Sequence, residues 1–275
     1  MACRGHAGRP LMEWLGYYLA LGAFVGFFAG MLGIGGGGVM VPLLVWLLEA
    51  QGMPRDTVLH LSVGTSMATI LFTSASSVRA HSARGAVRWD IAWRMTPGIL
   101  IGGLVGSAIA NVIPTVLFAA LFTVMVYAAS GNMLIDRKPK PSRTVPGPIG
   151  ASAVGFGISA VSAFAAIGGA FITVPFMLYC NVPMMQAIGT AAVVGFPIAL
   201  AGTVGFIVGG WGSPVLPAWS LGYVYLPALA GITVASVLFA PLGAMAAHKL
   251  PTKILKRIFA VLLFVFATKM LVGML

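Results

Sequence analysis

Two related stretches decide the fold: Gly-Ile-Gly-Gly-Gly-Gly-Val-Met-Val-Pro at 33–42 and Ile-Gly-Gly-Ala-Phe-Ile-Thr-Val-Pro at 167–175. Each stretch lies between apolar segments and ends on a short apolar run that carries a proline. A glycine inside a helix costs about 1 kcal/mol relative to alanine, so several in succession interrupt the helix. We therefore predict that each stretch ends one helix and begins another.

The composition places these breaks in a membrane protein. The chain has 275 residues, of which 59% are hydrophobic and only 8% are charged, whereas soluble domains carry about a quarter charged residues. Its apolar runs are continuous and long enough for spanning helices, unlike the alternating segments of a barrel. We predict an all-α polytopic membrane protein with apolar segments at about 11–31, 39–49, 58–78, 92–111, 115–135, 149–166, 171–180, 185–208, 222–247 and 255–274.

The basic residues give the orientation. The formal net charge is +11, and the basic residues concentrate in the short loops 79–94, 136–148 and 248–257. This pattern indicates cytoplasmic loops rather than a nucleic-acid-binding face. The uncharged loop 209–221, with its two tryptophans, is expected outside. A multi-pass protein of the bacterial inner membrane, in contact with lipid and without a nucleic-acid partner, is therefore predicted.

The second half of the chain repeats the first. Besides the two glycine-rich stretches, Gly64-Thr65-Ser66 matches Gly189-Thr190-Ala191, and Pro114-Thr115 matches Pro251-Thr252, in the same order. Chance similarity between apolar helices is the alternative. We predict two membrane repeats, 11–135 and 149–275, joined by a basic, proline-rich cytoplasmic linker at 136–148.

The charge pattern indicates that the repeats are inverted. Segment 58–78 ends at a basic loop, whereas its counterpart 185–208 ends at the uncharged loop. Inverted repeats are common in transporters. Each repeat should hold a glycine-broken helical hairpin and three transmembrane helices, giving eight full spans plus two hairpins, or about ten helices. The hairpins are either re-entrant or pairs of short crossings, and they place the N-terminus outside.

The breaks are candidate anion sites. A helix that begins at membrane depth presents free N–H groups and the positive end of its dipole. The candidates are Gly35, Gly36, Gly37 and Gly38 in the first repeat and Gly168 and Gly169 in the second. Inverted repeats would bring the two sets together near the midplane. The alternative is that these glycines only allow close helix packing.

Three hydroxyl residues and one histidine complete the candidates. Thr65, Ser66 and Thr190 could donate hydrogen bonds to a bound anion, or could instead bond a carbonyl of their own helix. His60 lies one helical turn before Gly64 and could carry a coupled proton. Its alternative is a place at the helix end, near water.

These motifs and their order resemble the TauE/SafE family, over residues 16–274. The resemblance implies a transporter for sulfite, sulfoacetate or another organosulfonate. The second copy departs from the first, because Ala170 and Phe171 stand where Gly37 and Gly38 do, and Ala191 stands where Ser66 does.

The resulting prediction is a secondary transporter that moves a small sulfur-containing anion by alternating access. No ATP-binding loop is present in the sequence, so the energy would come from a proton or other ion gradient or from the gradient of the anion itself. An anion channel is the main alternative. An intramembrane enzyme is less favoured, because the sequence has no His-Glu-x-x-His and no Gly-x-Ser-x-Gly. We expect neither a cofactor nor a metal ion.

Overall fold

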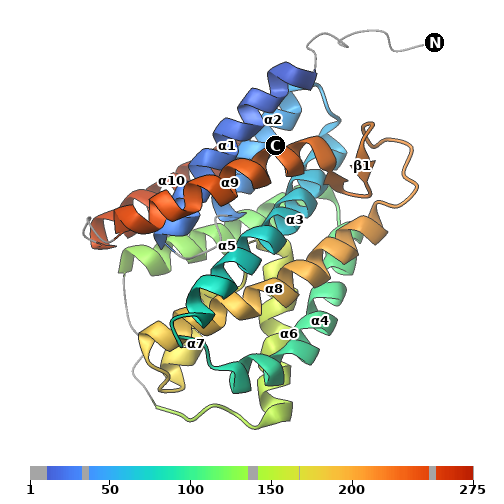
Figure 1. The fold of residues 1–275 in the computed structure, drawn as a ribbon. Helices are drawn as coiled ribbons and strands as arrows, with labels where there is room; N and C mark the ends of the chain where they lie inside the picture. Colours follow the sequence, from blue (N-terminus) through green and yellow to red (C-terminus); the bar gives the residue numbers. More distant parts are fainter. Residues whose placement is uncertain (1–10, 33–36, 136–141, 167, 248–251, 275) are drawn as a thin grey trace, which may run out of the picture.

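The structure is a computed structural model that describes residues 11–32, 37–135, 142–166, 168–247 and 252–274. Within these residues the chain forms ten helices and one small β-hairpin (Figure 1). In chain order they are α1 (Leu11–Leu32), α2 (Gly37–Ala50), α3 (Arg55–Ser82), α4 (Trp89–Val112), α5 (Thr115–Ile135), α6 (Pro148–Ala165), α7 (Ala170–Tyr179), α8 (Met184–Gly209), β1 (Ser220–Leu221), β2 (Val224–Tyr225), α9 (Leu226–Ala247) and α10 (Thr252–Met274).

The helices suit a membrane. Five of the described helices, α3, α4, α5, α6 and α8, are long and apolar enough to cross a bilayer. The outward faces are themselves apolar, as Leu104, Ile109 and Val124 illustrate by their exposure. Lipid can cover such faces, and helices satisfy their own backbone hydrogen bonds there. The prediction of an all-α polytopic membrane protein is confirmed.

Helices α3 and α8 form the centre of the molecule and run antiparallel (Figure 1). Gly64 of α3 packs against Phe206 near the end of α8, and Met67 packs against the earlier Gly202. Most of α3 is buried. The candidate residues on this helix therefore face protein rather than lipid.

Two parallel helix pairs flank this centre: α1 with α9, and α4 with α6. Glycines allow the backbones of each pair to touch. A Cβ added at Gly102 of α4 would lie 2.2 Å from the Phe156 carbonyl oxygen of α6, and one added at Gly22 of α1 would lie 2.4 Å from the Ile232 carbonyl oxygen of α9. Such close contact through small residues is typical of membrane helices.

The helix pairs follow a pattern of exchange between the two halves. If α1 to α5 correspond in order to α6 to α10, then α1 corresponds to α6 and α4 to α9. The contacting pair α1–α9 then corresponds to the pair α6–α4. The pairs α3–α8 and α5–α10 each correspond to themselves. Two copies related by a two-fold axis would give this pattern. It supports the proposal that 11–135 and 149–275 are inverted repeats.

The segments before α3 and α8 are hairpins that return to the end of the bundle from which they start. The amide of Gln51, after α2, donates to the hydroxyl of Tyr18 on α1. The N–H of Ser142, ahead of α6, donates to the Tyr179 carbonyl at the end of α7. With 10 residues, α7 is only about 15 Å long, half the thickness of a bilayer core. As a regular helix, α7 is therefore too short to cross a bilayer core by itself.

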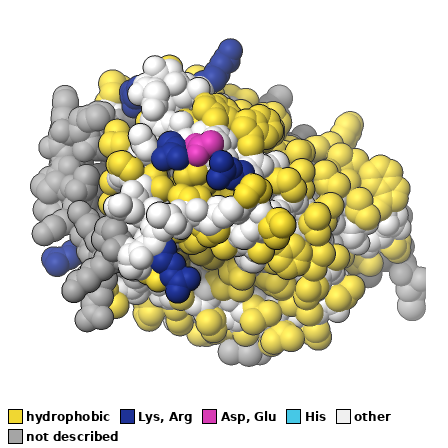
Figure 2. Space-filling model, turned by 90° about the horizontal axis from the view of Figure 1, so that it is seen from below, with side chains coloured by type: hydrophobic (Ala, Val, Ile, Leu, Met, Phe, Trp, Pro, Cys, Tyr) yellow, Lys and Arg dark blue, Asp and Glu magenta, His cyan; other side chains and the backbone are white. Residues whose placement is uncertain are grey.

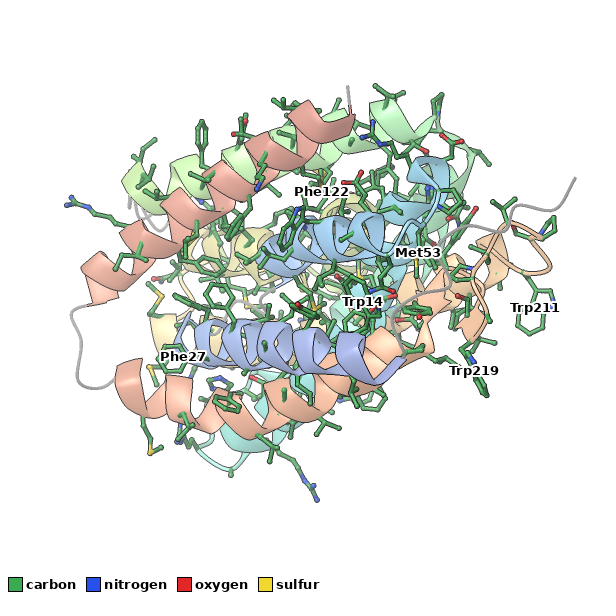
Figure 3. The ribbon with its side chains drawn as sticks, turned by 90° about the horizontal axis from the view of Figure 1, so that it is seen from above. Trp14, Phe27, Met53, Phe122, Trp211 and Trp219 are labelled. Carbon is green, nitrogen blue, oxygen red and sulfur yellow. The ribbon has the colours of Figure 1, made fainter. Side chains whose placement is uncertain are left out.

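The two ends of the bundle differ in chemistry. Arg88 at the start of α4 pairs with Asp90, with 2.8 Å between nitrogen and oxygen, and Figure 2 shows basic side chains beside an acidic one on an otherwise largely apolar face. At the other end, Trp211 and Trp219 project from the loop after α8 (Figure 3). By the positive-inside rule, the arginine end is expected to face the cytoplasm, and this orientation stays a prediction.

The apolar segment predicted at about 222–247 contains α9, which begins at Leu226. Ser220–Tyr225 forms the β1–β2 hairpin, which turns through Gly222 with φ of +55°. Positive φ is unfavourable in a right-handed helix, and glycine adopts it readily.

Candidate functional site

The tips of the two hairpins meet inside the molecule. A Cβ added at Gly37, the first residue of α2, would lie 1.7 Å from the carbonyl oxygen of Ala166, which follows α6. It would also lie 3.0 Å from the side chain of Ile70 on α3. Gly37 and Gly38 are buried, whereas Gly35 and Gly36 lie outside the described residues. The described parts of the two glycine breaks are therefore in direct contact.

The second tip has a tightly turned backbone. Ala166, Gly168 and Gly169 all have positive φ, at 48°, 58° and 70°. Gly169 is the N-cap of α7, and it has no side chain to cap the helix. The carbonyl of Gly169 accepts from the N–H groups of Ile172 and Thr173, which leaves the first turn of α7 with its positive end at the tip.

Apolar side chains and close backbone contacts enclose this tip. Ile198 of α8 and Ile158 of α6 lie beside Gly169, and Gly195 of α8 approaches the carbonyl oxygen of Gly168. All of these residues are buried. Such a low-dielectric wall strengthens the interaction between a helix dipole and a charge. The second tip is therefore enclosed by side chains of α6 and α8.

Two buried hydroxyls near the tips have no hydrogen-bond partner among the described residues. Ser66 lies one turn from Ile70 on α3, and Thr173 lies one turn from Gly169 on α7. Both side chains are fully buried. Unpaired polar groups are rare in protein interiors, and each calls for an explanation such as a ligand or water. Ser66 was a sequence candidate, whereas Thr173 was missed, although it lies within the motif at 167–175.

Thr65 and Thr190 make contacts of a different kind. The Thr65 hydroxyl oxygen accepts from the N–H of Tyr225 at 2.9 Å, and that of Thr190 accepts from the N–H of Arg88 at 2.9 Å. Both threonines are fully buried. The expected alternative, a bond to a carbonyl of their own helix, is not what the structure shows. Substrate binding by these two residues stays a prediction.

His60 is buried rather than turned towards water. Its side chain is 5% exposed and lies between the rings of Phe118 and Tyr223, with centroids 5.0 Å away in each case. Its Nε2 lies 3.1 Å from the carbonyl oxygen of Ala110, so in the neutral ring Nε2 carries the proton and donates. Its Nδ1 has no partner among the described residues. That nitrogen is an acceptor without a donor among those residues.

Charged groups lie away from the tips in the described parts of the chain. The ion pairs there, Arg55 with Glu49 and Arg88 with Asp90, are at the ends of helices. No cluster of three or more metal-ligating side chains occurs among those residues. The chemistry available at the tips therefore comes from backbone N–H groups, helix dipoles and hydroxyls.

Two hairpins whose tips meet beside α3 and α8 suit a membrane transporter, and the comparisons with known proteins show this class. The sequence profile of the family described as Sulfite exporter TauE/SafE matches residues 18–270. The chain belongs to this TauE/SafE family, as the motifs predicted, and it is a multi-pass protein of the cell membrane.

Curated relatives carry transporter names. A "Probable membrane transporter protein" of Haemophilus influenzae is 38% identical over 253 residues, which cover 92% of this chain and 96% of the relative. The "Probable membrane transporter protein YdhB" of Bacillus subtilis is 25% identical over 199 residues, which cover 70% of this chain and 78% of the relative. No solved structure is significantly similar to the chain.

Proposed function

We propose that this protein is a secondary transporter that moves a small sulfur-containing anion, such as sulfite, sulfoacetate or another organosulfonate, by alternating access. The family description names sulfite export. The observation that carries the proposal is the contact between the hairpin tips, where Gly37 packs on the carbonyl of Ala166. Two interrupted helices that meet from opposite ends of a bundle are the arrangement that transporters use for a central site.

The tips suit a small oxyanion. The start of α2 at Gly37 and the start of α7 after Gly169 supply helix N-termini, which attract negative charge without a buried cation. The hydroxyls of Ser66 and Thr173 can donate to sulfite or sulfonate oxygens. We propose that these groups, with Gly35, Gly36, Gly38 and Gly168, contact the substrate, and that Thr65 and Thr190 lie behind them.

The membrane potential favours export. With the cytoplasm negative, expelling one negative charge gains about 2.3 kcal/mol for each 100 mV. Uptake of an anion would need a coupled cation. The Nδ1 of His60 is a buried place for a proton, and protonation there would support either proton-coupled uptake or exchange.

Flux measurements in proteoliposomes test this proposal. Uptake of radiolabelled sulfite, sulfoacetate and methanesulfonate is measured with and without a pH gradient and with an imposed membrane potential. We expect saturable flux of at least one of these anions, in competition with the others. Absence of flux for all of them would remove the proposed substrate class, and unitary currents in planar bilayers would show a channel instead of a carrier.

A further inference from the structure

The two threonine bonds form a matched pair that joins the halves of the molecule. Thr65 lies on α3 and accepts from the residue just before α9, which is 160 residues away in the chain. Thr190 lies on α8 and accepts from the residue just before α4, which is 102 residues away. Because α3 corresponds to α8 and α9 to α4, the same bond occurs twice with the halves exchanged.

A glycine accompanies each of these bonds. A Cβ added at Gly64 would lie 2.2 Å from the carbonyl oxygen of Tyr223, and one added at Gly189 would lie 2.0 Å from that of Ala86. In each case the carbonyl belongs to the residue two places before the bonded N–H. The backbone entering α9 thus lies directly on α3, and the backbone entering α4 lies directly on α8.

The two bonds lie at opposite ends of the bundle. The bond of Thr65 lies at the end with the β1–β2 hairpin, and the bond of Thr190 lies at the end with Arg88 and Asp90. The surroundings of the first bond are fully buried, with Tyr225 only 6% exposed, whereas Arg88 is partly exposed. The tips of the hairpins lie between the two.

We propose that these bonds are two latches, one on each side of the central site, and that they open in alternation. The outer latch is Thr65 with the N–H of Tyr225, and the inner latch is Thr190 with the N–H of Arg88. This inference rests on the alternating-access function proposed above and assigns positioning roles to the two threonines. The structure, with both latches formed, corresponds to a state closed at both ends.

Cysteine accessibility tests the latches without any substrate. In a chain with Cys3 and Cys180 replaced, reporter cysteines are placed at Val224 or Val87, the residues just before the two bonded N–H groups. Thr65→Val should raise the rate of maleimide labelling at position 224 and not at 87. Thr190→Val should do the reverse. A change of about fivefold is expected from the loss of one net hydrogen bond.

Matched variants separate a latch from a general loss of packing. Thr65→Ser and Thr190→Ser keep the acceptor oxygen and should restore slow labelling. Thr123→Val removes a buried hydroxyl that bonds only the Ala119 carbonyl of its own helix, and should change neither reporter. Equal rates in all variants, or faster labelling at both positions in both valine variants, would overturn the proposal. Because no anion is added, this result is independent of the flux experiment, which tests the substrate class alone.

Discussion

Ser66 is a candidate substrate contact because its buried hydroxyl has no hydrogen-bond partner among the described residues. Several buried hydroxyls on the described helices bond a carbonyl of their own helix, as the Thr69 hydroxyl bonds the Thr65 carbonyl and the Ser130 hydroxyl bonds the Val126 carbonyl. Ser66 makes no such bond, although it is fully buried. Its oxygen is therefore free to serve a ligand.

Replacing Ser66 by alanine should weaken substrate binding without destabilising the protein. The hydroxyl has no partner to lose, whereas a hydrogen bond to a charged ligand contributes about 1.5–3 kcal/mol. We expect the KM for the transported anion to rise about tenfold or more at unchanged thermal stability in detergent. Ser130→Ala, on α5, is the matched control. An unchanged KM in Ser66→Ala would exclude this hydroxyl from the site.

His60 gives a second prediction at the scale of one residue. His60→Gln keeps a donor for the Ala110 carbonyl but cannot take up a proton. If His60 couples the proton, the variant should still exchange labelled for unlabelled anion, while the stimulation of flux by a pH gradient is lost. If the pH gradient stimulates flux in the variant as it does in the wild type, a group other than His60 couples the proton.

At the scale of elements, the parallel pair α4–α6 depends on the absence of side chains. Gly98, Gly102 and Gly106 follow one another at intervals of four on α4, and each packs on a carbonyl of α6. A side chain at any of them would have to push the two backbones apart. This row of glycines lets the backbones of α4 and α6 pack against each other within the membrane.

Gly102→Val should therefore lower the stability of the folded protein. Overpacking a tight contact costs about 1–3 kcal/mol, and here the obstacle is backbone, which cannot rotate away. We expect a lower temperature of unfolding in detergent, measured by size-exclusion chromatography after heating. Gly157→Val, on α6, where a Cβ would meet no atom within 4 Å, is the control. Equal unfolding temperatures for the two variants would contradict the packing account.

At the scale of the whole molecule, much of the architecture could be predicted from the sequence. The interruption between α6 and α7, the short length of α7 and the positions of α3 and α8 follow from glycine chemistry and apolar run lengths. The resemblance between the halves predicted two inverted repeats, and the helix pairs follow the pattern that two repeats related by a two-fold axis would give.

The remaining features depend on contacts between distant parts of the chain. Thr65 was predicted to face a substrate or its own helix, but it bonds a backbone N–H 160 residues away. Nothing in the neighbouring sequence indicates which distant backbone N–H group will donate a hydrogen bond to a given threonine hydroxyl. The β1–β2 hairpin was missed for a related reason, since its residues are as apolar as a helix start and contacts with distant residues hold their conformation, such as those of Tyr223 with Gly64 and Phe206.

The contact between the hairpin tips is the claim on which the function rests, and Gly37→Ala tests it most directly. The added methyl would lie 1.7 Å from the Ala166 carbonyl oxygen, so the tips must separate. Flux of labelled sulfite into proteoliposomes is compared between the wild type, Gly37→Ala and the control Gly157→Ala, at equal amounts of inserted protein. We predict that flux falls at least about tenfold in Gly37→Ala, the equivalent of about 1.4 kcal/mol, and stays at the wild-type level in Gly157→Ala. Wild-type flux in Gly37→Ala would contradict a central site built from the two tips.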